Sequence, residues 1–198
     1  MLQKIIIFSF TLILVSSFNM TYGQNETKSD VNVIYGKKHI FTINTPKNWI
    51  NDKELAEKIG LVCFFYPNND KEKTKKNYFF ANGIDKVKEN ENLTDYIKND
   101  LERLRKKYPD ITFEKINADF SGGITSGVLY SFSNLTDKYK EEVVYMETDD
   151  AFLIFTFASM TTKDYENYQP VFDKFVASFN FRGNNPKPFL DYIKNKER

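Results

Sequence analysis

The sequence predicts an α+β domain: a central, mainly antiparallel sheet with helices on both faces, forming a three-layer α/β/α sandwich. Apolar residues in the second half of the chain recur with a period of two, as in antiparallel strands joined by hairpins. Two stretches, 60–67 and 152–157, are apolar at consecutive positions, which is typical of strands covered on both faces. Two amphipathic stretches, 93–107 and 164–178, supply the covering helices.

The N-terminal segment, residues 1–23, predicts a secretory signal peptide. One charge, Lys4, precedes the apolar run 5–18, and Gly23 completes a small-residue cleavage pattern before Gln24. The run is too short to cross a hydrocarbon core as a helix, which takes about 20 residues. We therefore expect an exported chain, periplasmic or extracellular. An uncleaved, membrane-anchored form is the alternative.

The charge balance and the cysteine count restrict the function classes. The chain holds 28 basic and 27 acidic residues, and cleavage after Gly23 would remove one lysine, leaving 27 of each. A nucleic-acid partner is not predicted, because phosphate binding requires a basic surplus. Cys63 is the only cysteine, so no intramolecular disulfide can form, and the core must come from the 19 Phe and 12 Tyr. Export without disulfides is typical of a protein of the bacterial cell envelope. No stretch after the N-terminal segment is apolar enough to span a membrane.

Three segments are expected after cleavage. Residues 24–36 are polar and aperiodic, which predicts a flexible leader. Residues 37–182 form the folded domain. Residues 183–198 are a linker followed by a short amphipathic helical turn around Phe189, Leu190 and Ile193.

The first half of the domain alternates strands with one short helix. Pro46 ends the first strand, and Pro67 ends the continuous apolar run. The predicted elements are a strand at 39–43, a helix at 53–58, a strand at 60–67, a charged loop at 68–76 and a strand at 77–86.

The segment 93–107 carries the clearest helix signals. Asn92 is a suitable N-cap, with Asp95 three residues on, and Pro109 ends the element. Its apolar residues follow the i, i+4, i+8 spacing of one buried helix face: Leu93, Ile97, Leu101, Leu104 and Tyr108.

The second half reads as strands closed by a helix. Asp149-Asp150 is a two-residue hairpin signal, and Gly122-Gly123 marks a turn or bulge. In the helix 164–178, Pro170 predicts either a kink or the true start of the helix. The predicted strands are 111–116, 126–133, 141–148 and 151–159.

Two short motifs carry a family resemblance. The stretch Phe41–Trp49 reads F-x-I-x-x-P-x-x-W, and the stretch Phe172–Phe181 is a helix end running into Ser-Phe-x-Phe. Both resemble the PsbP-like and Mog-type superfamily, over about residues 37–182. That superfamily includes extrinsic photosystem subunits and a Ran-binding factor. The resemblance implies an α/β/α sandwich and a binding or accessory role rather than an enzyme, but fold does not transfer function.

Candidate catalytic chemistry is sparse. Cys63 and His39 are the only thiol and the only imidazole, and a nucleophilic pair would need them within hydrogen-bond reach. Cys63 lies inside Leu61-Val62-Cys63-Phe64-Phe65, where a free cysteine usually acts as a small buried hydrophobe. The sequence therefore predicts no catalytic residue.

No metal site or cofactor is predicted either. Zinc needs three or four Cys, His or carboxylate ligands, and calcium needs a loop spacing that this chain lacks. Asp149-Asp150 is better explained as turn chemistry, and Gly122-Gly123 lacks the spacing of a nucleotide loop. The run Lys71–Lys76 contains Glu72 and fits a solvated loop.

Two functions remain open, beside a weaker third interpretation as a metal-dependent accessory factor. The first is an exported, non-catalytic binding or accessory protein whose partner is a protein, peptide or lipid of the cell envelope. The alternative is a small extracytoplasmic hydrolase with a carboxylate pair, a spatial feature that sequence does not reveal. Trp49 is either a sugar-stacking platform or, as we expect, a core anchor beside the helix that holds Leu55 and Ile59. The scattered carboxylates considered for a pair are Asp110, Glu114, Asp119 and Glu147.

Overall fold

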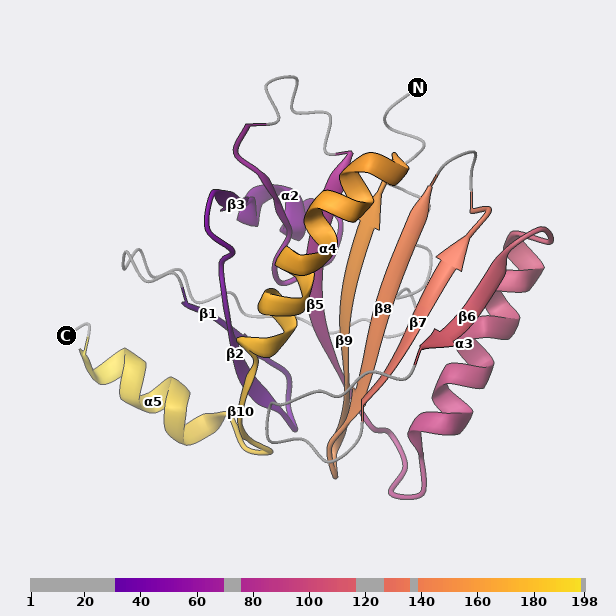
Figure 1. Ribbon diagram of the computed structural model, residues 1–198. Coiled ribbons are helices and arrows are strands. Elements are labelled where there is room, and N and C mark those ends of the chain that lie inside the picture. The colour runs from indigo at the N-terminus through magenta and orange to yellow at the C-terminus, as the bar shows by residue number, and fades with distance from the viewer. Residues whose placement is uncertain (1–30, 70–75, 117–126, 136–138, 197–198) are drawn as a thin grey trace.

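A computed structural model describes residues 31–69, 76–116, 127–135 and 139–196 (Figure 1). They form two mainly antiparallel sheets with helices packed on them, which confirms the predicted α+β class. The signal peptide, the first part of the leader and Gly122-Gly123 lie outside the described residues. In the described part of the chain, no helix is long and apolar enough to cross a membrane.

A large sheet and a small sheet divide the strands between them. The small sheet has the order β1 (Val31–Tyr35), β2 (Ile40–Asn44), β10 (Asn180–Gly183). The large sheet has the order β3 (Trp49–Asn51), β4 (Phe65–Pro67), β5 (Asn77–Asp85), β9 (Ala151–Ser159), β8 (Lys140–Glu147), β7 (Gly127–Ser133), β6 (Thr112–Ile116). The described helices are α2 (Lys53–Lys58), α3 (Leu93–Lys107), α4 (Thr162–Ala177) and α5 (Lys187–Lys196).

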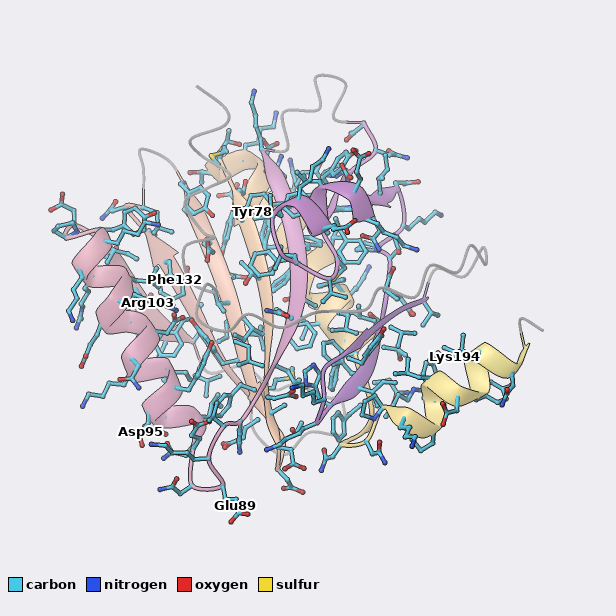
Figure 2. All side chains as sticks on the ribbon, turned by 180° about the vertical axis from the view of Figure 1, so that it is seen from behind. Tyr78, Glu89, Asp95, Arg103, Phe132 and Lys194 are labelled. Atoms are coloured by element: carbon cyan, nitrogen blue, oxygen red, sulfur yellow. The ribbon has the colours of Figure 1, made fainter. Side chains whose placement is uncertain are left out.

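Side chains of β9, the central strand, alternate between two cores. Phe155 and Phe157 point to one side, where they meet Phe175 and Phe172 of α4. Phe152 points to the other side and stacks on Tyr96 of α3, with ring centroids 4.6 Å apart. Figure 1 shows α4 crossing over β9 and β5, and Figure 2, seen from behind, shows α3 and α2 in front of the sheet. We call these two surfaces of the large sheet the α4 side and the α3 side.

The predicted leader 24–36 is wrong over its last residues, because 31–35 form β1. This strand pairs antiparallel with β2 from Val31↔Asn44 to Tyr35↔Ile40. The side chain of Asn32 donates to the hydroxyl of Thr45 (2.9 Å), so even its polar position has a partner. Five residues interrupted by Asn32 resemble a polar leader in sequence, and only the β2 edge makes them a strand.

The predicted strand 60–67 is also wrong over its first half. Only Phe65–Pro67 is a strand, although Leu61, Cys63 and Phe64 are buried as well. Gly60, at φ +73°, ends α2 in the left-handed conformation that glycine adopts readily. Phe64 then accepts a backbone hydrogen bond from Asp52 (2.8 Å). An apolar run predicts that its residues are buried, but not that they form a strand. Here the buried residues before Phe65 lie in irregular backbone, whose polar groups form hydrogen bonds outside a strand ladder.

The C-terminal third follows the prediction more closely. Asp149-Asp150 connects the hairpin of β8 and β9, and the amide of Thr148 donates to the carbonyl of Ala151 (2.9 Å). Helix α4 begins at Thr162, capped by Thr161, and contains Pro170, so the proline is not its start. The predicted linker is wrong at Gly183, which ends β10, and the helix beyond it is longer than one turn.

Candidate functional site

The predicted candidates separate in the structure. The Sγ of Cys63 donates to the carbonyl of Ala81 (3.4 Å), and burial raises the pKa of this thiol to about 12. A thiol in this environment is not a nucleophile at neutral pH. The Nδ1 of His39 lies 2.7 Å from Asp85 instead, and its Nε2 has no hydrogen-bond partner in the described part of the chain. Cys63 and His39 therefore form no dyad, and Cys63 is the buried hydrophobe that the sequence predicts.

His39 connects the small sheet to the large one. Its ring is 1% exposed and lies against two glycines, so a Cβ built on Gly83 would come within 2.1 Å of Nε2. Asp85 also accepts the backbone N–H groups of Lys37 and Lys38 (2.9 and 3.0 Å). Burial acts to raise the pKa of Asp85, but the hydrogen bonds from His39 and these two amides outweigh it and lower the pKa. Nε2 is buried against Gly83, so we interpret the His39–Asp85 pair as a structural contact between the two sheets.

The carboxylates proposed for a catalytic pair are not brought together. Glu147 forms an ion pair with Lys86 (2.7 Å) on the α3 side, and its second oxygen accepts from the backbone of Leu93. Glu114 lies on β6 with its side chain on the α4 side, by the pairing register. Asp110 is exposed after α3, and Asp119 lies outside the described residues. In the described part of the chain, no group of three or more metal-ligating side chains gathers.

Trp49 is a core residue, as predicted, but it packs on a different helix. Its ring stacks on Phe79 of β5, with centroids 3.9 Å apart, and meets the edge of Tyr168 of α4 at 5.3 Å. Leu55 and Ile59 belong to a separate cluster on the α3 side. The expected contact with their helix is therefore wrong, because β3 directs the indole to the α4 side.

A site that the sequence did not predict lies around Glu142 of β8. The Tyr165 hydroxyl donates to Glu142 Oε1, and the hydroxyl of Ser131 in turn hydrogen-bonds Tyr165. Glu142 is 3% exposed, and its second oxygen, Oε2, is buried and has no hydrogen-bond partner among the described residues. A buried carboxylate with an unused oxygen is costly, so this feature requires an explanation.

Pairing register places other polar side chains beside Glu142 on the α4 side. Ser131 of β7 lies opposite Glu142, and Glu114 of β6 lies opposite Ser131. The next row adds Lys140, Ser133 and Thr112. Of the described helices, only the first part of α4 reaches this surface, and β7 and β6 lie beside the helix (Figure 1). We call this patch the β6–β8 surface: Thr112, Glu114, Ser131, Ser133, Lys140 and Glu142.

The electrostatics of this patch favour a proton or another cation. Burial raises the pKa of Glu142, the Tyr165 hydroxyl opposes that rise, Asp173 adds to it, and Lys140 opposes it. Burial also raises the pKa of Asp173, although the side-chain amide of Gln169 donates to it (3.0 Å). A nearby cation, Lys140, lies over the ring of Tyr165, 4.9 Å from the centroid. The carboxylates around Tyr165 are therefore incompletely compensated.

One sequence signal could have indicated this site. Glu141 and Glu142 are adjacent in a strand whose neighbours, Val143, Val144 and Tyr145, are apolar on both faces. Adjacent strand residues point to opposite faces. In a strand covered on both sides, each glutamate must then enter a core region. This signal is missed when every charged residue of a strand is assumed to face solvent.

Comparison with known proteins identifies the fold. No family model and no curated protein matches the sequence. The solution structure of cyanobacterial PsbP from Synechocystis sp. PCC 6803 aligns with a TM-score of 0.52 at 12% identity, covering 82% of this chain and 99% of that chain. This likeness shows that the chain shares the fold of that PsbP structure, as the sequence resemblance predicts. The Saccharomyces cerevisiae Ran-binding protein Mog1p aligns with a TM-score of 0.45 at 13% identity, covering 71% and 89%.

Proposed function

We propose that this chain is an exported accessory protein that binds a partner through the β6–β8 surface. The observation that carries the proposal is the incomplete helix cover of the α4 side. Helix α4 lies over β9 and β5, while Glu114 and Thr112 of β6 remain exposed. Polar side chains that face water beside a rigid helix and sheet can form a preorganised binding surface.

We also propose a three-layer arrangement, which fits this binding role. The alternation of β9 places α4 on one side and α3 with α2 on the other, so both central faces are filled with aromatic side chains. A sheet filled in this way offers its edges and its outer strands for contact. The likeness to PsbP concerns the fold, and the binding role is inferred from the surface itself.

Export is supported by the signal-peptide pattern of residues 1–23. We expect the mature N-terminus at Gln24, within a residue or two. N-terminal sequencing of the protein from its own envelope fraction tests this, and an intact Met1 would contradict it.

Site-specific photo-crosslinking tests the binding role. A photoreactive residue at Thr112, exposed on the β6–β8 surface, should capture a defined envelope partner. The matched control is the same residue at Glu102, exposed on α3 on the other side of the sheet. Equal capture from both positions, or from neither, would reject the β6–β8 surface as the binding face.

One observation favours the hydrolase alternative. Glu142 and Glu114 flank Ser131 on one face, and neighbouring strands lie about 4.8 Å apart, so their backbones are about 10 Å apart. Glycosidases use two carboxyl groups that face one site, and a raised pKa suits the general acid of such a pair. Against it, one oxygen of Glu142 accepts from Tyr165 and the other is buried. Glycosidase activity that Glu142→Gln and Glu114→Gln each abolish would establish the hydrolase instead.

A further inference from the structure

We infer that the buried carboxylate of Glu142 binds the guanidinium group of an arginine side chain on the partner. This guanidinium stacks on Tyr165 and donates to the unused Oε2 of Glu142. This inference rests on the proposed binding role of the β6–β8 surface and names the chemistry that the surface recognises.

The first argument is the unused oxygen. Glu142 is 3% exposed, and among the described residues only its Oε1 has a donor. A carboxylate accepts only, so Oε2 can be satisfied only by a donor from outside the described contacts or by protonation. A charged donor gives the stronger hydrogen bond.

The second argument is the internal cation. Lys140 precedes Glu142 by two residues in β8, so both side chains lie on the same face. Its ammonium lies over the Tyr165 ring at 4.9 Å, the position of a cation–π contact, without a hydrogen bond to Glu142. The ring therefore already accepts a cation. Lys140 is half-buried, and the inference requires its side chain to move aside so that a guanidinium can reach Oε2.

The third argument is the choice of guanidinium over ammonium. A guanidinium is planar, so it can stack on a tyrosine ring while its edge donates two parallel hydrogen bonds. Glu142 Oε2, the Ser131 hydroxyl and the Asp173 carboxylate supply acceptors around the Tyr165 ring. A compact ammonium reaches the ring or the carboxyl, as Lys140 itself illustrates.

The experiment is a titration of the mature protein with acetyl-Gly-Arg-Gly-amide, followed by NMR chemical shifts and calorimetry. We expect millimolar binding, with the lysine peptide several-fold weaker and the norleucine peptide inactive. Glu142→Gln should weaken arginine binding by about tenfold or more. Lys140→Met, which removes the competing cation, should strengthen it. Glu102→Gln on the α3 side is the matched control and should change nothing.

A second readout separates binding from a purely structural role. Saturation with the arginine peptide should lower the pKa of Glu142, measured by the carboxyl carbon shift, because the guanidinium favours the ionised form. Agmatine in place of the peptide distinguishes the sources: equal affinity indicates small guanidinium compounds, and weaker affinity indicates a polypeptide side chain.

The inference is overturned if the arginine peptide does not bind, or if Glu142→Gln or Lys140→Met leaves its affinity unchanged while both variants stay folded. Loss of peptide binding with retained crosslinking from Thr112 would reject the guanidinium site and leave the proposed function intact. Loss of both would reject the proposed function.

Discussion

Glu141 and Glu142 are adjacent in β8, yet the two sides of the sheet treat them differently. On the α3 side, Glu141 accepts from Tyr139 (2.5 Å), and the Tyr139 hydroxyl in turn bonds that of Tyr78 (3.0 Å). On the α4 side, Glu142 retains an oxygen without a donor. The difference teaches that a buried carboxylate indicates binding only where its hydrogen-bond capacity is incomplete.

A second carboxylate on the α3 side follows the pattern of Glu141. Asp100 of α3 is 4% exposed, accepts from the Tyr145 hydroxyl (2.7 Å) and pairs with Arg103, whose place on the outer face of α3 is visible in Figure 2. Burial and the nearby Asp100 carboxylate hold the pKa of Tyr145 well above its usual range. The α3 side therefore uses its buried acids to fasten helix to sheet.

The largest expected effect tests whether the α4 side is fastened by packing instead. Trp49→Ala should lower the free energy of unfolding by roughly 3–5 kcal/mol, because it removes a ring stacked on Phe79 and leaves a cavity beside Tyr168. Urea unfolding measures this. A domain of this size is stabilised by only about 5–15 kcal/mol, so Trp49→Phe, which keeps a ring, is the matched control. Near-normal stability of Trp49→Ala with loss of partner capture would make Trp49 a binding residue.

The next largest effect is the loss of stability when one tyrosine on each side of the large sheet loses its hydroxyl. Tyr145→Phe should cost about 1–3 kcal/mol at neutral pH, because Asp100 loses a buried donor. Tyr165→Phe should cost less, because the pKa of Glu142 is already raised and its carboxyl can take up a proton. Chemical denaturation of both variants at the same pH makes the comparison. Equal losses would remove the distinction between the two sides.

Substitutions of Cys63 test how tightly the core on the α4 side is packed around its sulfur atom. Cys63→Ser should cost about 1–3 kcal/mol, because a hydroxyl is less tolerated in this apolar site, whereas Cys63→Ala should leave only a small cavity. The native thiol should resist alkylating reagents until the chain unfolds, because it is buried and its pKa is raised to about 12. Rapid labelling of the folded protein would contradict this.

The smallest effect is a pH dependence specific to Glu142. The pKa of Glu142 is raised in the folded state, so the native protein binds its proton more tightly than the unfolded chain does. Stability should therefore fall as pH rises from the unfolded pKa through the folded one. Glu142→Gln should remove that decline and stabilise the protein at neutral pH.

The matched measurement uses Asp85, whose pKa is shifted in the opposite direction. Its folded pKa is lowered, so its contribution is present above the unfolded pKa and is lost as pH falls through the folded one. Asp85→Asn should weaken that acid-side loss and leave the decline from Glu142 in place. Thermal unfolding across the pH range resolves both. An unchanged profile for Glu142→Gln would place its carboxyl in water-like surroundings.

Prediction from sequence succeeded where the signal was local. Helix α3 begins after Asn92 and runs to Lys107, because the cap, the apolar stripe and Pro109 all lie within one segment. The hairpin at Asp149-Asp150 was predicted for the same reason. Strand β1 and the irregular stretch before Phe65 were mispredicted, because their structure depends on partners distant in the chain.

By itself, the sequence determined the α+β class, the long amphipathic helix and the buried character of Cys63 and Trp49, since periodicity and apolar runs follow from local geometry. Tertiary structure decided which side each buried group enters and whether it finds a partner there. Register across three strands brings Glu114, Ser131 and Glu142 into one row, and α4 adds Tyr165. Hydrogen-bond satisfaction depends on groups far apart in sequence, so the unused oxygen of Glu142 exists only in the folded chain.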